Sequence, residues 1–247
     1  KIYLSKFFIT DVISYEQIKK KNHYFFNKYT HIINTAIHPK YINLKYNKKF
    51  DLDFNFIKKF NTIKFCYVFF NTRKIYLPKE NISEISSIYP LGNYAKNKLI
   101  TEKYLKKRLK NKVVSLRISN VIGKRIFNNV RNNHKLFFDN FLNYKKKIKD
   151  FKILVNDDFK DFLSINQFCR IVQKIIKLNL KGVYNVSISE KIYLSEIIKW
   201  LDKRLFKKIE FTETSRNSFT LSNAKLLKKI KIKLTKNQLK KFCEKLN

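Results

Sequence analysis

Four apolar runs, separated by segments with helical patterning, constrain the fold of this chain more than any other feature. The longest is IKFCYVFFNT at residues 63–72. It is rich in β-branched and aromatic residues and almost uncharged, which is typical of a strand buried on both faces. Comparable runs occupy residues 30–37, 113–119 and 182–188. Together with a strand expected within residues 1–10 and helical patterns at 14–28, 45–61 and 93–110, the first half of the chain gives the order strand–helix–strand–helix–strand–helix–strand. This alternation predicts an α/β protein with a doubly wound parallel sheet and helices on both of its faces.

The other segments give weaker predictions. Strands are expected within residues 1–10 and 159–165, and helices within residues 14–28, 45–61, 134–147, 166–179 and 194–205. The chain contains no run of about 18 apolar residues, which a membrane-spanning helix would need, and no signal-peptide pattern. Its three cysteines, Cys66, Cys169 and Cys243, have neither metal nor disulfide spacing. The sequence therefore predicts a cytoplasmic protein without a metal site.

The formal net charge is +37, which would suit a polyanionic partner, with nucleic acid as the first candidate. Arginine, however, supplies 8 of the 55 basic residues and lysine the other 47, whereas a dedicated nucleic-acid binder would use more arginine forks. Lysine, asparagine, isoleucine, phenylalanine and tyrosine all have A/T-rich codons and are abundant, while glycine, proline and alanine are scarce. Compositional drift therefore explains the charge better than a nucleic-acid partner does.

A tyrosine and a lysine four residues apart are the strongest candidates for chemistry. In YPLGNYAKNKLITE, residues 89–102, Tyr94 and Lys98 would share one helix face, and an ammonium beside a phenol favours phenolate. Four of the 14 tyrosines have a lysine at this spacing, namely Tyr15, Tyr24, Tyr41 and Tyr94. Only Tyr94 lies between two predicted strands, of which one ends at Thr72 and the other is followed by Asn120. Ligands of such sheets bind beyond the carboxyl ends of the strands, so Thr72, Tyr94 and Asn120 are expected to line one crevice.

In their order and spacing, these segments resemble the extended short-chain dehydrogenase/reductase family of NAD(P)-dependent nucleotide-sugar epimerases, dehydratases and reductases. The resemblance runs from about Asp11 to the C-terminus. Its motifs are INTAI at 33–37, FFNTRKIY at 69–76, YPLGNYAKNKLITE at 89–102, LRISNVIG at 116–123, FKDFLSI at 159–165, GVYNVSI at 182–188 and TSRNSFTLSNAKLLKKI at 214–230. It implies a Rossmann-like fold, with a cofactor domain over residues 1–123 that is completed by about 159–188. The implied smaller substrate-binding region covers residues 124–158 and 189–247.

The resemblance also implies roles for particular residues. Tyr94 would exchange a proton with a sugar hydroxyl or ketone, Lys98 would lower the pKa of Tyr94 and bind the nicotinamide ribose, and Thr72 would hydrogen-bond the reacting oxygen. The residues implied to bind NAD or NADP are Asn34, Thr35, Ala36, Phe70, Tyr94 and Lys98, and those implied to bind a nucleotide-diphosphate sugar are Thr72, Asn120, Lys160 and Arg216. Simpler explanations exist for three of them. Thr72 could cap a turn, Arg216 could be an ordinary surface charge, and Lys160 lies among other lysines.

Two departures from the family pattern narrow the prediction. The glycine-rich turn that binds dinucleotides is absent from the sequence. The opening strand–helix–strand unit, of at least about 30 residues, is therefore missing and is expected before residue 1. Arg73 and Lys74 follow Thr72 at the positions where family dehydratases carry an Asp-Glu pair, and cations cannot act as that base. These residues favour an epimerase or a 4-keto reductase over a dehydratase.

Two other hypotheses remain open from the sequence. The chain could be a non-catalytic basic module that binds nucleic acid or another polyanion, or it could be a truncated copy without function. For the enzyme, the expected partner is a nucleotide-diphosphate sugar. A homodimer is an additional option, and no membrane partner is expected.

Overall fold

The computed structural model describes residues 2–123, 153–212 and 217–246. The predicted helix at 134–147 and the predicted site residue Arg216 lie outside these ranges. The chain divides into two compact units. The first comprises Lys1–Leu77, Glu84–Ile118 and Cys169–Asn185, and the second comprises Pro78–Ser83, Ser119–Phe168 and Val186–Asn247. The assignment of cofactor and substrate roles to separate regions of the chain stays a prediction.

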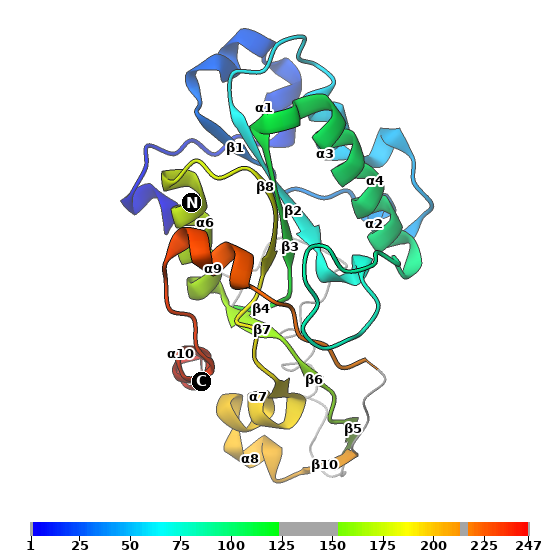
Figure 1. The fold of residues 1–247 in the computed structure, drawn as a ribbon, viewed down its shortest axis with the longest axis vertical. Coiled ribbons are helices and arrows are strands. Elements are labelled where there is room, and N and C mark those ends of the chain that lie inside the picture. Colours follow the sequence, from blue (N-terminus) through cyan, green and yellow to red (C-terminus); the bar gives the residue numbers. More distant parts are fainter. Residues whose placement is uncertain (1, 124–152, 213–216, 247) are drawn as a thin grey trace. The chain divides into compact units, whose positions relative to one another are not determined.

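A four-stranded sheet forms the centre of the first unit (Figure 1). Its strands are β1 (His31–Ile33), β2 (Cys66–Thr72), β3 (Val113–Ile118) and β8 (Gly182–Val186), in the order β1-β2-β3-β8. β2 pairs in parallel with β1 on one side, where Cys66 faces His31, and with β3 on the other, where Tyr67 faces Val113. These strands coincide with the four apolar runs, because a strand covered on both faces needs apolar side chains on both.

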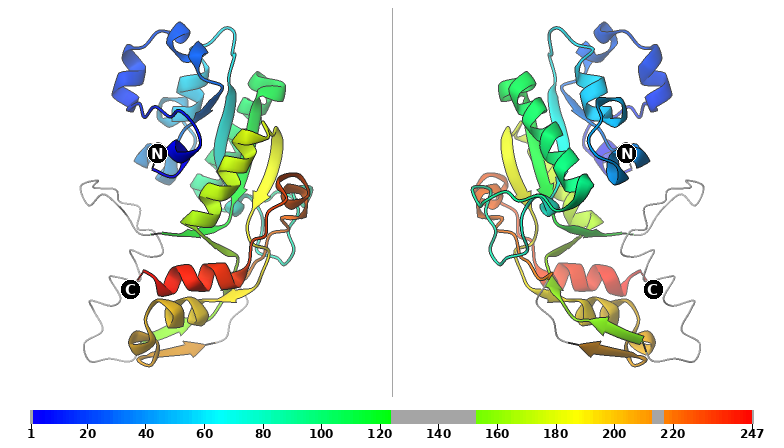
Figure 2. Two further views of the ribbon diagram at one scale, coloured as in Figure 1. Left: turned by 90° about the vertical axis from the view of Figure 1, so that its left-hand side faces the viewer. Right: turned by 90° about the vertical axis from the view of Figure 1, so that its right-hand side faces the viewer.

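Helices cover both faces of this sheet (Figure 2). On one face lie α2 (Pro39–Asn43), α3 (Leu52–Ile57) and α4 (Gly92–Leu109), and on the other lies α6 (Ile165–Lys177). α4 begins at Gly92, whose φ of 72° lets the chain turn sharply from the preceding loop into the helix. The predicted α/β fold with a doubly wound parallel sheet is therefore confirmed.

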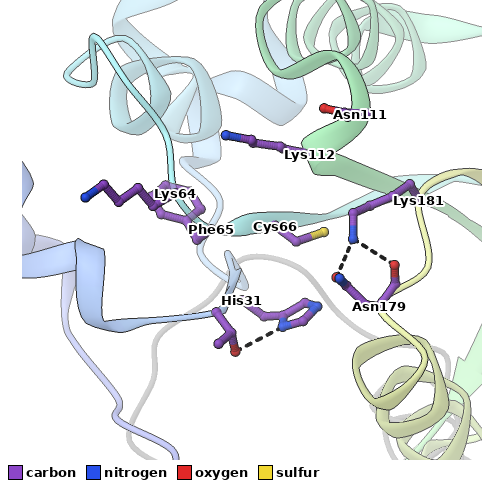
Figure 3. A pocket seen from close by; sticks show the side chains of 9 residues that line it. His31, Lys64, Phe65, Cys66, Asn111, Lys112, Asn179 and Lys181 are labelled. Carbon is purple, nitrogen blue, oxygen red and sulfur yellow. Dashed lines mark hydrogen bonds between the residues drawn. The ribbon is translucent and has the colours of Figure 1, made fainter.

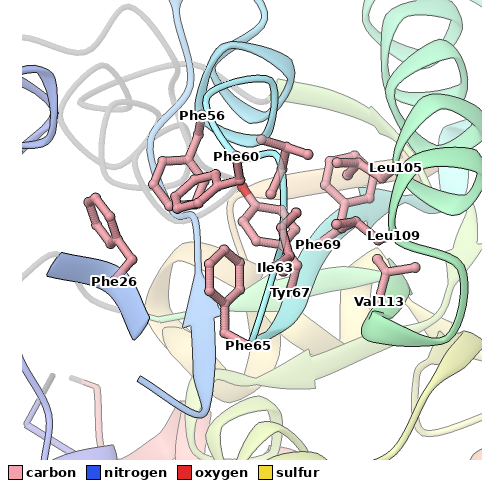
Figure 4. Close-up of a cluster of buried hydrophobic side chains, with 11 residues drawn as sticks. Phe26, Phe56, Phe60, Ile63, Phe65, Tyr67, Phe69, Leu105, Leu109 and Val113 are labelled. Carbon is pink, nitrogen blue, oxygen red and sulfur yellow. The ribbon is translucent and has the colours of Figure 1, made fainter. Parts of the chain in front are cut away.

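Eleven buried apolar side chains pack between the sheet and the helices of the first unit (Figure 4). They are Phe26, Phe56, Ile57, Phe60, Ile63, Phe65, Tyr67, Phe69, Leu105, Leu109 and Val113. Tyr67 and Phe69 alternate along β2 and so point to the same face, which is the face that α3 and α4 cover. Burial of each such side chain stabilises the fold by about 1.5–3 kcal/mol. This core packs the first half of β2 against the C-terminal part of α4.

The N-terminal segment differs from its prediction, because no strand forms within the described part of residues 1–10. Instead, Leu4–Lys6 forms a short 3-10 helix, η1. The N–H groups of Phe7 and Phe8 both donate to the carbonyl oxygen of Leu4 at 3.0 Å. Hydrogen bonds within the segment therefore take the place of hydrogen bonds to a neighbouring strand. A strand is stable only when a neighbouring strand satisfies its backbone polar groups, and none of the described strands pairs with this segment.

Two predicted helices of the first unit are shorter or interrupted in the structure. The helix expected over 14–28 is split into α1 (Tyr15–Lys20) and the 3-10 helix η2 (His23–Lys28). The break occurs because the Asn22 side chain accepts from the N–H of Phe25 and so starts a new helix. The segment expected to be helical over 45–61 contains the 3-10 helix η3 (Lys48–Phe50) and α3.

The second unit consists of three small two-stranded sheets and four helices among its described residues. β4 (Asn120–Ile122) pairs with β7 (Phe162–Ser164), β6 (Phe159–Lys160) with β9 (Ile192–Tyr193), and β5 (Ile153–Asn156) with β10 (Ile209–Thr212). The helices are α7 (Leu194–Leu201), α8 (Lys203–Phe206), α9 (Ala224–Ile230) and α10 (Lys236–Glu244). Within residues 2–123, 153–212 and 217–246, no helix has the length and apolarity that crossing a bilayer requires.

Candidate active site

Thr72 is the last residue of β2, and only 8% of its surface is exposed. Its backbone N–H donates to Oδ1 of Asn71 at 2.7 Å, and its hydroxyl oxygen accepts from the N–H of Lys74 at 3.3 Å. The hydroxyl therefore caps the short 3-10 helix η4 (Arg73–Ile75), which follows the strand. Because the hydroxyl only accepts in this contact, its own proton can still be donated to a ligand oxygen.

Tyr94 and Lys98 lie one turn apart on α4, as the sequence predicts. Tyr94 is half-buried, and its hydroxyl has no hydrogen-bond partner among the described residues. Lys98 is buried, with its ammonium 4.6 Å from the centre of the Phe69 ring and 5.8 Å from that of Tyr41. Aromatic rings and an aliphatic stem thus enclose the ammonium, and Asp53 supplies a carboxylate 4.0 Å away.

The electrostatics of this pair differ from the expectation that Lys98 lowers the pKa of Tyr94. Burial, together with the negative charge of Asp53, raises the pKa of Tyr94 from 10.0 to about 12. Burial lowers the pKa of Lys98, and the carboxylates of Asp53 and Asp51 oppose that effect. The expectation is wrong here, first because burial disfavours the charged phenolate and second because the negative charge of Asp53 opposes its formation. Tyr94 is therefore a neutral phenol at pH 7.

Asp53 connects several residues of the candidate site. One carboxylate oxygen accepts from the hydroxyl of Tyr67 at 2.7 Å and from Nδ2 of Asn34 at 2.9 Å. The other oxygen faces Lys98, and both side chains of this ion pair are only 8% exposed. Asp53 therefore links Asn34, which follows β1, to Lys98 of α4.

A second buried carboxylate, Asp51, lies at the start of α3. It caps the helix by accepting from the N–H of Phe54 at 2.9 Å, and it also accepts from the hydroxyls of Thr101 at 2.6 Å and Tyr46 at 2.9 Å. The hydroxyl of Tyr41 is 2.6 Å from that of Thr101, and this tyrosine lies buried in α2. Neither aspartate is among the site residues predicted from the sequence. The signal that could have found them is DLD, two carboxylates within an aromatic segment of a chain that has only 18 acidic residues.

A third buried carboxylate, Glu102, joins α4 to β2 and β3. It accepts from Nη2 and Nε of Arg117 at 2.7 and 3.2 Å, from Ser115 at 2.6 Å and from Nδ2 of Asn71 at 2.5 Å. Burial alone would raise the pKa of Glu102, but the Arg117 guanidinium and the hydrogen bonds outweigh burial and lower it. Because Nδ2 of Asn71 faces Glu102, its Oδ1 faces the backbone of Thr72. Glu102 therefore holds the Asn71 side chain and, through it, the backbone of Thr72, the candidate catalytic residue.

The residues predicted to hold the cofactor all belong to the first unit. Asn34 follows β1, is half-buried, and accepts from the N–H of Ala36 at 2.9 Å while it donates to Asp53. Thr35 and Ala36 are exposed, and Phe70 is half-buried on β2. Hydroxyl and amide groups of this kind suit a ribose. Asn34, Lys98 and the unpartnered phenol of Tyr94 therefore fit the nicotinamide-ribose end of a dinucleotide.

The residues predicted to hold the substrate belong to the second unit, apart from Thr72. The N–H and Nδ2 of Asn120 both donate to the carbonyl oxygen of Asp161 at 3.2 Å. Nζ of Lys160 is 3.9 Å from Oδ2 of Asp158. Arg216 lies outside the described residues. The convergence of Thr72, Tyr94 and Asn120 on one crevice stays a prediction, as do the substrate-binding roles of Lys160 and Arg216.

Comparison with known proteins relates this arrangement to a large group of enzymes. No family model matches the sequence. The structure superposes on WbmH of Bordetella bronchiseptica in complex with NAD+, with a TM-score of 0.70, 20% identity, and coverage of 87% of this chain and 73% of that one. It also superposes on UDP-glucuronic acid 4-epimerase of Bacillus cereus in complex with NAD, with a TM-score of 0.68, 18% identity, and coverage of 92% and 76%. The chain has the fold of the extended short-chain dehydrogenase/reductases.

A further solved structure with this fold is a complex with NADPH. RMD of Pseudomonas aeruginosa complexed with NADPH has a TM-score of 0.64 and 16% identity over 87% of this chain and 80% of that one. Among curated proteins, the RNA polymerase subunit beta' of Oedogonium cardiacum is 29% identical over 184 residues, 72% of this chain. The match spans only 8% of the length of that subunit, so the activity of the whole subunit is not inferred for this chain.

Proposed function

We propose that this protein is an NAD(P)-dependent epimerase or 4-keto reductase that acts on nucleotide-diphosphate sugars. The observation that carries the proposal is the Tyr94 hydroxyl, which has no partner among the described residues and lies one turn from the buried Lys98. Thr72 supplies a second hydroxyl at the end of β2, where ligands of parallel sheets bind. The shared fold with nucleotide-sugar epimerases supports the same conclusion.

In the reductive direction of the proposed reaction, Tyr94 gives its proton to a sugar carbonyl oxygen while the carbon of that carbonyl accepts a hydride. A bound NAD or NADP supplies or accepts the hydride. Thr72 donates a hydrogen bond to the same oxygen and holds the substrate in place, and Lys98 would hold the nicotinamide ribose. In the oxidative direction the proton returns from the sugar hydroxyl to Tyr94. Epimerisation requires both directions in turn, whereas a reductase requires only the first.

The cation that follows Thr72 argues against the elimination of water at this site. Burial lowers the pKa of Arg73 to about 10, so its side chain remains charged at neutral pH and cannot accept a proton there. Lys74 is exposed and cationic as well. A dehydratase needs a base at such a position, so we favour the epimerase or the reductase.

The test is the variant Tyr94→Phe, which removes the proton but keeps the ring. We expect kcat to fall by about 100-fold or more, the usual contribution of a general acid, while binding of a nucleotide-diphosphate sugar remains. Turnover is measured from the absorbance of the reduced nicotinamide, and binding is measured by calorimetry. Unchanged turnover in Tyr94→Phe would contradict the proposal.

The matched control is Tyr24→Phe, because Tyr24 also precedes a lysine at i+4. Tyr24 is 69% exposed and lies in η2, away from the residues that Asp53 joins. We expect this variant to keep the activity of the unaltered protein.

A cytoplasmic location belongs to the same proposal, since Cys66, Cys169 and Cys243 are all free thiols.

A further inference from the structure

A cavity of about 380 Å³ opens at the amino ends of the strands of the first unit (Figure 3). Its lining residues are Thr30, His31, Lys64, Phe65, Cys66, Asn111, Lys112, Asn179 and Lys181. His31 starts β1, Cys66 starts β2, and Lys112 and Lys181 directly precede β3 and β8. Thr72 lies at the opposite end of β2, about 20 Å away along the strand. The cavity is therefore separate from the candidate active site.

The charge of this cavity has one sign. Three of its nine lining residues are lysines, and none is an aspartate or a glutamate. In the described part of the chain, Lys64, Lys112 and Lys181 take part in no ion pair, so their charges are not neutralised locally. The candidate active site differs in this respect, because Asp53 neutralises Lys98 there. An uncompensated cluster of ammonium groups in a cavity favours an anionic ligand.

Lys181 is held in place before any ligand binds. Its ammonium donates to the carbonyl oxygen of Asn179 at 2.7 Å and to Oδ1 of the same residue. The loop conformation is defined, because Asn179 and Gly182 both have positive φ angles, 47° and 99°. An ammonium has three N–H donors, so Lys181 keeps one for a ligand. Preorganisation of this kind reduces the entropy lost on binding.

His31 provides a second donor. Its Nδ1 is 3.2 Å from the hydroxyl of Thr30, whereas its buried Nε2 has no hydrogen-bond partner among the described residues, although Asn179 interacts with the ring. Burial and the charge of Lys181 lower the pKa of His31, so the ring is neutral at pH 7 and Nε2 can carry its one N–H. Figure 3 shows His31, Cys66, Asn179 and Lys181 facing one another across the cavity, with Lys64 and Lys112 extending from its rim. A buried donor without a partner costs free energy that a ligand oxygen would recover.

We propose that this cavity is a binding site for the phosphate group of a small anionic molecule, with Lys181 and Nε2 of His31 as its principal donors. Phosphate oxygens accept several hydrogen bonds at once, and ammonium groups bind them as point charges. The volume exceeds that of one phosphate and lies at the lower end of the range for small-molecule sites, which leaves room for a sugar or nucleoside. A metal cation is disfavoured by the lysines, and the described residues contain no group of three or more His, Cys, Asp or Glu side chains placed to hold one.

The test measures phosphate affinity by calorimetry on the full chain at constant ionic strength near 0.15 M, where generic attraction between exposed charges is largely screened. The site variant is Lys64→Gln with Lys181→Gln, and the matched control is Lys228→Gln with Lys229→Gln on the exposed face of α9. Both variants remove two charges. We expect the dissociation constant for inorganic phosphate to rise by about tenfold in the site variant and to be unaffected in the control. An equal loss in both variants would show attraction to net charge alone and would overturn the site.

Two further measurements on the unaltered protein do not depend on how the variants fold. In a nitrogen-15 NMR titration with phosphate, the signals of His31, Cys66 and Lys181 should shift first and saturate together. Shifts spread over exposed lysines in both units would contradict the proposal. Titration with glucose 1-phosphate and with AMP then identifies the ligand class. If neither compound binds more tightly than inorganic phosphate, the site is one for free phosphate. Tighter binding of glucose 1-phosphate indicates a sugar phosphate, and tighter binding of AMP indicates a nucleotide. Binding of zinc in place of phosphate would also overturn the proposal.

Discussion

Asp53 bonds to Tyr67, Asn34 and Lys98, and its charge opposes ionisation of Tyr94. A phenol with a pKa of about 12 is a poor base at neutral pH, but it carries a proton that it can donate as a substrate oxygen gains charge. Because donation leaves a phenolate, the negative charge of Asp53 makes this proton harder to lose and disfavours the reductive half of the proposed reaction. The pairing of Tyr94 with Lys98 could be read from spacing alone. The role of Asp53 could not, because it lies 45 residues before Lys98 in the sequence.

Replacing Asp53 by asparagine should lower the pKa of Tyr94. The substitution removes the nearby negative charge while it keeps the size and a hydrogen-bond acceptor, so the phenolate becomes easier to form. The pKa is measured by NMR of tyrosine labelled with carbon-13 at Cζ, which requires no turnover. Asp51→Asn is the matched control, since Asp51 is equally buried but is not among the charges that raise the pKa of Tyr94. An unchanged Tyr94 titration in Asp53→Asn would refute this electrostatic role.

The packing of α4 against the sheet depends on one buried ion pair. Glu102 of α4 and Arg117 of β3 are 3% and 4% exposed at their side chains, and they approach to 2.7 Å. The sequence predicts both elements, because a helix and a buried strand have clear apolar patterns. It does not predict the pair, because the charges of Glu102 and Arg117 are ordinary in a chain with so many charged residues. Pairing across elements is a property of the fold and not of local spacing.

Breaking this pair should be costly. We expect Arg117→Met to lower the free energy of unfolding by about 3–5 kcal/mol, since it leaves Glu102 buried without its cation. The double variant Glu102→Gln with Arg117→Met should recover part of that loss, because two neutral groups are less costly to bury than a single charge. Urea denaturation measures both. A double variant less stable than Arg117→Met would show that the carboxylate matters chiefly through Asn71 and Ser115.

A matched exposed pair provides the comparison. Glu16 and Lys19 of α1 also approach to 2.8 Å, but their side chains are 77% and 58% exposed. Water and salt screen such a pair, so Glu16→Gln should leave the urea midpoint essentially unchanged. A shift for Glu16→Gln as large as that for Arg117→Met would indicate that local burial does not decide the energy.

The second unit contains a carboxylate that links its stability to pH. Asp161 is fully buried and accepts from the N–H groups of Ile188, Ser189 and Leu221 at 3.0, 3.1 and 3.2 Å. Burial raises the pKa of Asp161 from 3.8 to about 7, although these three bonds oppose the rise. Since its pKa is higher in the folded state, the contribution of Asp161 to stability is complete below about pH 4. It declines as the pH rises through 7.

This linkage predicts the behaviour of Asp161→Asn. The variant should be less stable than the unaltered protein, because an amide NH2 would face backbone donors that the carboxylate now satisfies. The difference in free energy of unfolding should narrow between pH 5 and pH 8, since only the unaltered protein loses stability there through residue 161. Thermal unfolding across this pH range gives the measurement. A difference that stays constant or widens with pH would contradict the raised pKa.

Across the chain, the sequence could predict the elements better than the site. The four central strands and α4 follow from long apolar runs, whose burial dominates any local preference. The strand expected within residues 1–10 fails because pairing depends on a neighbour that local patterning does not reveal. The tyrosine, the lysine and the threonine of the site could be named from their order along the chain. The pKa of Tyr94 depends on burial and Asp53, and that of Lys98 on burial, Asp53 and Asp51, which three-dimensional packing alone brings together.

Among the described residues, only two lysine or arginine side chains are buried, Lys98 and Arg117, and each lies against a buried carboxylate. Most of the other described lysines and arginines are exposed to water, where one more lysine changes little in the free energy of folding. Codon drift toward lysine can therefore change many surface residues of such a protein while the buried charged residues of the candidate site stay the same. The drift would change ion-exchange behaviour, solubility and nonspecific adhesion. The two buried ion pairs, Lys98–Asp53 and Arg117–Glu102, would determine whether the protein keeps its activity.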